Sequence, residues 1–180
     1  MKFWDNIRNY FYKKNLGKRL LGLNTNRNVT NLQDAKTIGI IYDSTHADND
    51  IIITKFAEEL RNQGKTVDIL GYVNDNKTEH KDDIVIFNKK NVSWTRIPQG
   101  DKVENFAIKN FDLLLACYTD ENLPLEYVAQ TSKAKWRVGA YSNDKTACYD
   151  MMINVGDKKD LQYLIGQTIY FLNQIKYDSK

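Results

Sequence analysis

The feature that most constrains the fold is a pair of continuous apolar runs, each followed by polar turn residues and a helical pattern. The runs are KTIGIIYD at residues 36–43 and FDLLLACYT at residues 111–119. Strands that are apolar at nearly every position are typical of parallel sheets whose two faces are both covered. We therefore predict that both runs are central strands with helices packed on either side.

Strand-like and helix-like segments alternate along most of the chain around these two runs. For the helix expected at residues 49–64, Asp48 or Asn49 is the expected N-cap and Gly64 the expected C-terminal cap. The alternation predicts a three-layer, Rossmann-like α/β domain with a mostly parallel sheet over residues 32–180. The other expected strands are 65–73, 83–92, 136–142 and 149–155, and the other expected helices are 103–110, 122–134 and 157–177.

Residues 1–31 indicate a basic amphipathic helix followed by a linker of turn-favouring residues. Residues 1–28 hold seven basic side chains and one acidic one, a net charge of +6, whereas the remaining residues hold 19 basic and 22 acidic ones. The positive charge of the chain is thus concentrated in one segment, which is its clearest functional indication. The expected apolar stripe of this helix consists of Phe3, Trp4, Ile7, Tyr10, Phe11, Leu16, Leu20 and Leu21.

Three interpretations of the basic helix are open. It packs on the domain with its basic face in solvent, it binds an acidic partner such as RNA, or it lies on a membrane surface. A second basic and aromatic patch occurs within residues 87–102, where Trp94 either stacks on a base or packs over the sheet edge. The expected partner-binding residues are Arg8, Lys13, Lys14, Lys18, Arg19, Lys89, Lys90, Trp94 and Arg96.

Several classes of function lack their sequence signatures. No glycine-rich dinucleotide motif and no P-loop is present, and Asp48 and Asp50 would oppose an anion at the start of the following helix. Cys117 and Cys148 are not part of a CxxC pair and are expected in the core of a cytoplasmic protein. We expect no cofactor, no metal, no secretory signal and no transmembrane segment.

A site, if one exists, is expected where the central strands end, because open α/β sheets bind ligands at the carboxyl edge. Asp43, His46 and Asp48 are the candidates for a catalytic base or for metal ligands. The alternative is that helix capping and a solvated turn explain these residues. The residues expected to line such a site are Asp43, Ser44, His46, Asp48, Asp50, Thr119, Asp120, Glu121 and Asn143.

The sequence resembles two groups of known proteins. Residues 111–142 resemble the strand–helix–strand unit in the acceptor half of heptosyltransferase-like glycosyltransferases, where a "YDL" strand and an "RVG" strand flank a helix. Those enzymes use a second domain for the nucleotide sugar and place a catalytic Asp after a glycine in the first loop. In this sequence Asp48 and Asp50 lie in that loop, but the Gly-Asp pair is absent from it.

A longer resemblance covers nearly the whole chain. The basic N-terminal helix with AKTIGIIYD, FDLLLACY, AKWRVGAY and YDMMINV is similar to a family of short uncharacterised proteins found mostly in Bacteroidota. That resemblance implies a stand-alone Rossmann-like domain in a cytoplasmic protein, and it implies no activity.

These observations favour a non-catalytic binding module that presents its basic helix to an acidic macromolecule such as RNA or a ribonucleoprotein. The alternative hypothesis is a small enzyme or ligand-binding domain, glycosyltransferase-like or metal-dependent, that uses the loop at residues 43–50.

Overall fold

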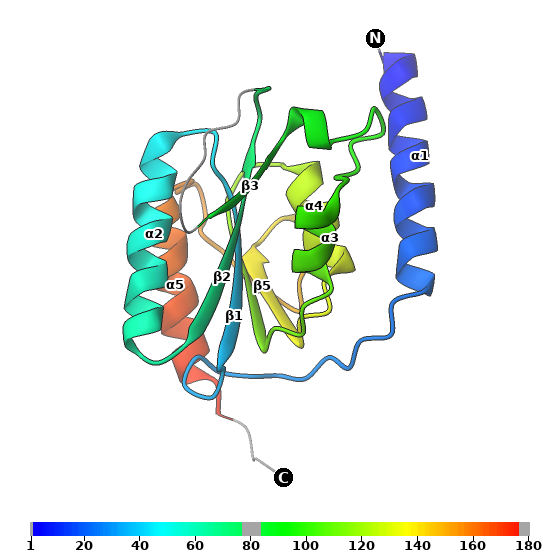
Figure 1. Ribbon diagram of the computed structural model, residues 1–180. Helices are drawn as coiled ribbons and strands as arrows, with labels where there is room; N and C mark the ends of the chain where they lie inside the picture. The colour runs from blue at the N-terminus through cyan, green and yellow to red at the C-terminus, as the bar shows by residue number, and fades with distance from the viewer. Residues whose placement is uncertain (1, 77–83, 177–180) are drawn as a thin grey trace.

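The computed structural model describes residues 2–76 and 84–176 and confirms the predicted three-layer α/β domain (Figure 1). Its described strands form one parallel sheet in the order β3–β2–β1–β4–β5–β6. The two predicted central strands, β1 and β4, are neighbours in the middle of this sheet. The strands are β1 (Thr37–Asp43), β2 (Thr66–Val73), β3 (Val85–Asn88), β4 (Leu113–Cys117), β5 (Trp136–Ala140) and β6 (Met151–Ile153).

Helices cover both faces of the sheet, which explains the continuous apolar runs. In β1, Ile38, Ile40 and Tyr42 belong to the core cluster shared with α2 and α5, whereas Ile41 belongs to the cluster shared with α3 and α4. All four side chains are fully buried. Figure 1 shows α2 (Ala47–Asn62) and α5 (Leu161–Gln174) on one face, and α3 (Asp101–Ala107) and α4 (Leu123–Thr131) on the other.

The third predicted strand is shorter than expected. It ends at Asn88, and residues Lys89–Asn91 form a 3₁₀ turn instead of continuing the strand. The Asn88 side chain accepts a hydrogen bond from the Lys90 N–H, and the Asn91 side chain accepts one from the Asn88 N–H. This reciprocal capping ends the strand, so the prediction of strand structure after Asn88 is wrong; residue 83 lies outside the described residues.

The two ends of α2 differ in how well they were predicted. The helix begins at Ala47 with His46 in the N-cap position, so the assignment of Asp48 or Asn49 as N-cap is wrong. At the other end, Gly64 has φ +80° and donates to the Arg61 carbonyl at 2.8 Å, while the next N–H reaches the Leu60 carbonyl at 3.2 Å. This is the left-handed cap that was predicted.

The N-terminal helix α1 (Lys2–Leu21) packs against α4, on the outer side of the helix layer (Figure 1). Tyr12 and Leu16 are its buried side chains, and the Tyr12 hydroxyl donates to the Leu123 carbonyl at 3.1 Å. Burial raises the pKa of Tyr12 well above its usual value. The expected apolar stripe is not the docked face as a whole, because its aromatic members Phe3, Trp4 and Tyr10 are 70%, 67% and 61% exposed.

The linker that follows α1 is held to the domain by hydrogen bonds. The Arg27 guanidinium donates to the carbonyl oxygens of Ala134 and Ser132, and the Asn28 N–H donates to the Lys135 carbonyl at 3.0 Å. Burial, followed by the nearby Arg137, lowers the pKa of Arg27 to about 10. These contacts hold the linker against the segment that joins α4 to β5.

The two cysteines lie in the core, as predicted. Both are free thiols, and burial raises the pKa of Cys117 to about 12 and that of Cys148 to about 11. Within residues 2–76 and 84–176, no helix is both long and apolar enough to cross a membrane.

Candidate functional site

The carboxyl ends of β1 and β4 meet where the strand order of the sheet reverses. Asp43 ends β1, and its carboxylate accepts a hydrogen bond from the Asn122 side chain at 3.1 Å and from the Thr45 N–H at 2.8 Å. Asn122 is the N-cap of α4, where its side-chain oxygen accepts from the Leu125 N–H at 3.3 Å. The capping bond fixes the orientation of the Asn122 side-chain amide. The NH₂ group of that amide in turn holds one carboxylate oxygen of Asp43 in place.

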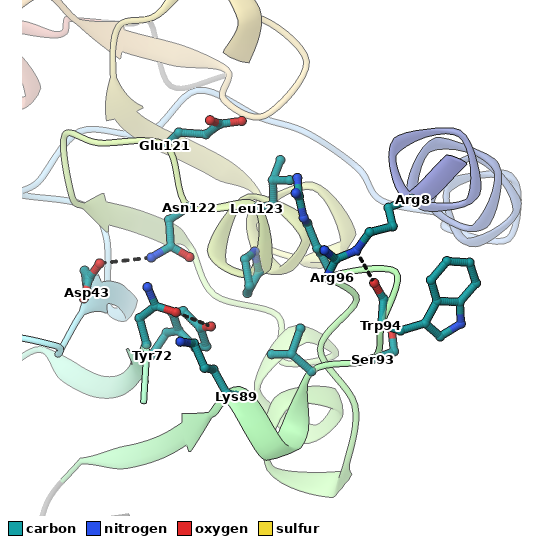
Figure 2. A pocket seen from close by; sticks show the side chains of 13 residues that line it. Arg8, Asp43, Tyr72, Lys89, Ser93, Trp94, Arg96, Glu121, Asn122 and Leu123 are labelled. Atoms are coloured by element: carbon teal, nitrogen blue, oxygen red, sulfur yellow. Dashed lines mark hydrogen bonds between the residues drawn. The ribbon is translucent and has the colours of Figure 1, made fainter. Parts of the chain in front are cut away.

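A cavity of about 650 Å³, the strand-end cavity, opens beside this pair. Figure 2 shows Asp43 and Asn122 on one side of it, with Arg8, Arg96 and Trp94 on the opposite side. Carboxylate and amide groups therefore face cationic groups that come from other parts of the chain. The cavity is lined by Arg8, Asp43, Tyr72, Asn74, Lys89, Val92, Ser93, Trp94, Arg96, Glu121, Asn122, Leu123 and Pro124.

A second cavity of about 500 Å³ lies on the other side of Asp43 and contains His46, Asp48 and Asp120 in its lining. Asp120 is engaged by Lys159, whose ammonium lies 2.6 Å from the carboxylate. In the described part of the chain, no three His, Cys, Asp or Glu side chains are grouped so that they could hold a metal ion. Asp43, His46 and Asp48 therefore share a cavity without forming a metal-ligand cluster.

The other residues expected at the strand ends have separate roles. Asp50 accepts hydrogen bonds from the buried hydroxyls of Tyr42 and Ser44, at 2.7 and 2.5 Å, and so ties α2 to β1. Glu121 lines the strand-end cavity and Thr119 lines the second cavity, whereas Asn143 accepts from the Tyr141 hydroxyl and lines neither. The nine expected residues thus do not converge on one pocket.

The second basic and aromatic patch, predicted within residues 87–102, contains a hairpin at residues 92–98, and its Lys89 and Lys90 lie in the 3₁₀ turn before that hairpin. Val92 and Pro98 form an antiparallel bridge, the Ser93 N–H donates to the Ile97 carbonyl, and the Arg96 N–H donates to the Ser93 carbonyl. Trp94 stands at the tip and is 57% exposed. The Trp94 ring packs edge to face against Phe11 of α1 rather than over the edge of the sheet. Its exposed surface leaves the predicted stacking on a base as a prediction.

The hairpin and α1 are joined, so two patches far apart in sequence become one surface. The Arg8 side chain donates to the Trp94 carbonyl at 2.9 Å, and the rings of Phe11 and Trp94 meet edge to face with centroids 5.5 Å apart. The Arg96 guanidinium lies 3.4 Å from the Asp5 carboxylate. We call the open hollow along this junction, with a volume of about 910 Å³, the helix–hairpin groove.

The helix–hairpin groove combines aromatic rings with cations. Phe11, Trp94 and Tyr127 are among its aromatic lining, and Lys18 and Arg19 supply positive charge. Of the other predicted partner-binding residues, Arg8, Lys89 and Arg96 line the strand-end cavity instead, and Lys13, Lys14 and Lys90 are exposed and line neither.

Sequence reasoning missed three residues that build these sites. Asn122 precedes Leu-Pro, which is an N-cap signal, but nothing in the sequence indicates that its amide reaches Asp43. Tyr72 and Tyr127 carry no motif at all. Beneath Asn122, the backbone N–H of this residue donates to Glu126, which forms a buried ion pair with Lys145 at 3.1 Å.

The chain is similar to a protein family over most of its length. The model of a family of unknown function, DUF6913, matches residues 8–175. A similar solved structure is a glycosyl transferase family 9 protein from Veillonella parvula, with a TM-score of 0.48 and 16% sequence identity. That match covers 77% of this chain and 40% of the other, so this chain spans less than half of that protein. No curated protein matches the sequence.

Proposed function

This chain belongs to the DUF6913 family, and we propose that it is a cytoplasmic, non-catalytic binding module that holds single-stranded RNA in the helix–hairpin groove. The observation that carries the proposal is the junction of α1 with the 92–98 hairpin. It gathers rings from Phe11 and Trp94 and charges from Lys18 and Arg19 along one open groove.

The chemistry of the groove suits an unpaired strand. Aromatic side chains stack on unpaired bases, and lysine and arginine neutralise the phosphates between them. Trp94 presents more than half of its surface for such stacking. Bases within a duplex are already stacked on one another, so the exposed ring favours a single strand over a double helix.

The distribution of charge along the chain also favours RNA binding at α1. The basic segment that contains α1 faces solvent through Lys13, Lys14, Lys18 and Arg19. The rest of the chain carries more acidic than basic side chains and repels a polyanion. Long-range attraction therefore steers RNA toward α1 rather than toward α2 and α5.

Binding of a fluorescent single-stranded RNA of about 12 nucleotides, followed by anisotropy between about 50 and 200 mM salt, tests the proposal. The logarithm of the affinity is expected to fall linearly with the logarithm of the salt concentration. Replacing Lys18 and Arg19 by alanine together should reduce that slope by about 1.4, because each phosphate contact on a single strand contributes about 0.7. Lys55→Ala, an exposed lysine on α2, is the matched control and should leave the slope unchanged.

Trp94→Ala tests the stacking part of the same experiment. Loss of one stacked base should weaken binding about 5- to 100-fold at constant salt. Tyr170→Ala is the control, because Tyr170 is as exposed as Trp94, at 57%, but lies on α5. Equal affinities of the Trp94 variant and the wild type, or a slope near zero, would refute the proposal.

An anionic membrane surface is the second candidate partner, because the first turn of α1 exposes Phe3 and Trp4 beside the basic residues. Flotation with vesicles that contain anionic lipid distinguishes the two partners. Flotation of the wild type that is lost in a Phe3→Ala, Trp4→Ala double variant, together with no RNA binding, would assign α1 to a membrane instead.

A further inference from the structure

The strand-end cavity carries two kinds of polar chemistry at opposite sides. Asp43 and Asn122 stand at the strand ends, while Arg8 and Arg96 reach the opposite side of the cavity from α1 and from the 92–98 hairpin (Figure 2). Lys89, which follows β3, reaches the cavity beside Tyr72. A volume of about 650 Å³ lies within the range of small-ligand sites. A ligand that satisfies both sides needs an anionic group at one end and hydrogen-bond donors at the other.

We propose that the strand-end cavity binds a phosphate ester of a sugar with free hydroxyl groups. The phosphate lies against the guanidinium groups of Arg8 and Arg96, and the sugar hydroxyls donate to Asp43. This site goes beyond the proposed RNA groove, because Ser93 and Trp94 are the only described residues that line both hollows.

The phosphate end is built from arginines, whose planar fork of donors matches phosphate oxygens. Arg8 engages the Trp94 carbonyl through Nε at 2.9 Å, and that bond involves one of the five N–H donors of the guanidinium. The bonds of Arg96 to Asn9 and Asp5 are long, at 3.3 and 3.4 Å. Both side chains are therefore placed at the cavity with donor capacity beyond these contacts.

The backbone of Arg96 is a second, independent observation. Its φ is +65°, the left-handed region in which glycine is favoured, and it occupies the bulge position of the 92–98 hairpin. An arginine held at such a position stores backbone strain, and strain of this kind clusters at ligand sites. The residue with this backbone conformation is therefore also the one whose side chain lines the strand-end cavity.

The sugar end is built around Asp43. Its carboxylate accepts from the Thr45 N–H and from the Asn122 amide, whereas a carboxylate has about four acceptor sites. The Leu125 N–H holds the Asn122 amide in the orientation that donates to Asp43. The remaining acceptor sites are thus fixed in place for hydroxyl donors.

The position of this phosphate site explains why phosphate motifs are absent. In many α/β proteins the phosphate lies on a glycine-rich loop at the start of the first helix after the sheet begins. Here the first turn of α2 carries Asp48 and Asp50, which disfavour an anion. In this chain, side chains of α1 and the hairpin replace that loop.

Isothermal titration with ribose 5-phosphate, AMP, inorganic phosphate and ribose as separate probes tests the proposal. Both phosphate esters are expected to bind the wild type at least about tenfold more tightly than phosphate or ribose alone, since only the esters engage both ends. Tighter binding of AMP than of ribose 5-phosphate would identify a nucleotide as the source of the ligand, and equal binding a simple sugar phosphate. A 5′-phosphorylated RNA that displaces AMP, while 5′-hydroxyl RNA does not, would identify an RNA end.

Arg96→Gly and Asp43→Asn are the informative variants. Arg96→Gly relieves the backbone strain, so its thermal midpoint should equal or exceed that of the wild type while its affinity for ribose 5-phosphate falls at least about tenfold. Asp43→Asn should lower the affinity similarly, whereas Asp48→Asn, which faces the other cavity, should not. Absence of binding by both esters, or wild-type affinity in Arg96→Gly and Asp43→Asn, would overturn the proposal. Lys18 and Arg19 do not line this cavity. A failure of the RNA-binding experiment would therefore leave the outcome of the sugar-phosphate titrations unaffected.

Discussion

Gly139 and Gly166 show how differently one residue type is constrained in this molecule. A Cβ atom added to Gly139 in β5 would lie 2.5 Å from the Tyr149 ring. Tyr149 has no room to move, because it is buried and its hydroxyl is hydrogen-bonded to that of Tyr118 at 2.6 Å. A Cβ atom added to Gly166, within α5, would meet no side chain and no atom of another segment within 4 Å. Packing therefore requires glycine at the first position and not at the second.

Gly139→Ala is expected to lower the free energy of unfolding by about 1–3 kcal/mol, as overpacked cores do. Gly166→Ala should raise it by as much as about 1 kcal/mol, because alanine favours a helix more than glycine does. Urea denaturation measures both values. A stabilised Gly139→Ala, or a Gly166→Ala that is less stable than the wild type, would show that the packing around these residues is wrongly described.

At the scale of elements, α1 is attached through few residues. Leu16 and Tyr12 are buried side chains of this helix, and the Arg8 bond to the hairpin and the Arg27 bonds after the helix add to the attachment. The Arg96–Asp5 ion pair and the Phe11–Trp94 ring contact add to it on the hairpin side. Leu21, by contrast, is 91% exposed. The helix therefore depends on a short stretch of contact with α4.

Leu16→Ala is expected to lower the free energy of unfolding by about 2–3 kcal/mol and to speed hydrogen exchange of the α1 amides. Leu21→Ala removes the same atoms from an exposed position and should change stability by less than about 0.5 kcal/mol. If both variants behave alike, α1 is not docked through Leu16.

The elements themselves could largely be predicted from the sequence. Continuous apolar runs identified β1 and β4, and Gly64 identified the end of α2, because burial on two faces and left-handed backbone leave local signatures. The buried face of α1 has no such local signature, because the apolar residues of this helix spread over several of its sides. Packing against α4 is what buries Tyr12 and Leu16. The end of β3 depended on the side chains of Asn88 and Asn91, which bond each other only in the folded turn.

At the scale of the whole molecule, the sites are made by contacts between distant segments. The sequence placed Asp43 at the strand ends correctly, because parallel strands share a carboxyl edge. The basic helix and the second patch, in contrast, were predicted to be separate surfaces. Their union through Arg8, Phe11 and Trp94 spans more than eighty residues of sequence, and no local pattern encodes such a contact.

The most direct test of the account is an NMR footprint of single-stranded RNA on the full chain. The account predicts that backbone amide shifts on adding RNA are confined to α1, the 92–98 hairpin and the neighbouring groove residues Gln99 and Tyr127, with α2 and α5 unchanged. Lys18→Ala with Arg19→Ala should abolish these shifts at the same RNA concentration while the rest of the spectrum stays that of a folded protein. Shifts on α2 and α5, or none on the hairpin, would contradict the claim that helix and hairpin form one RNA-binding surface.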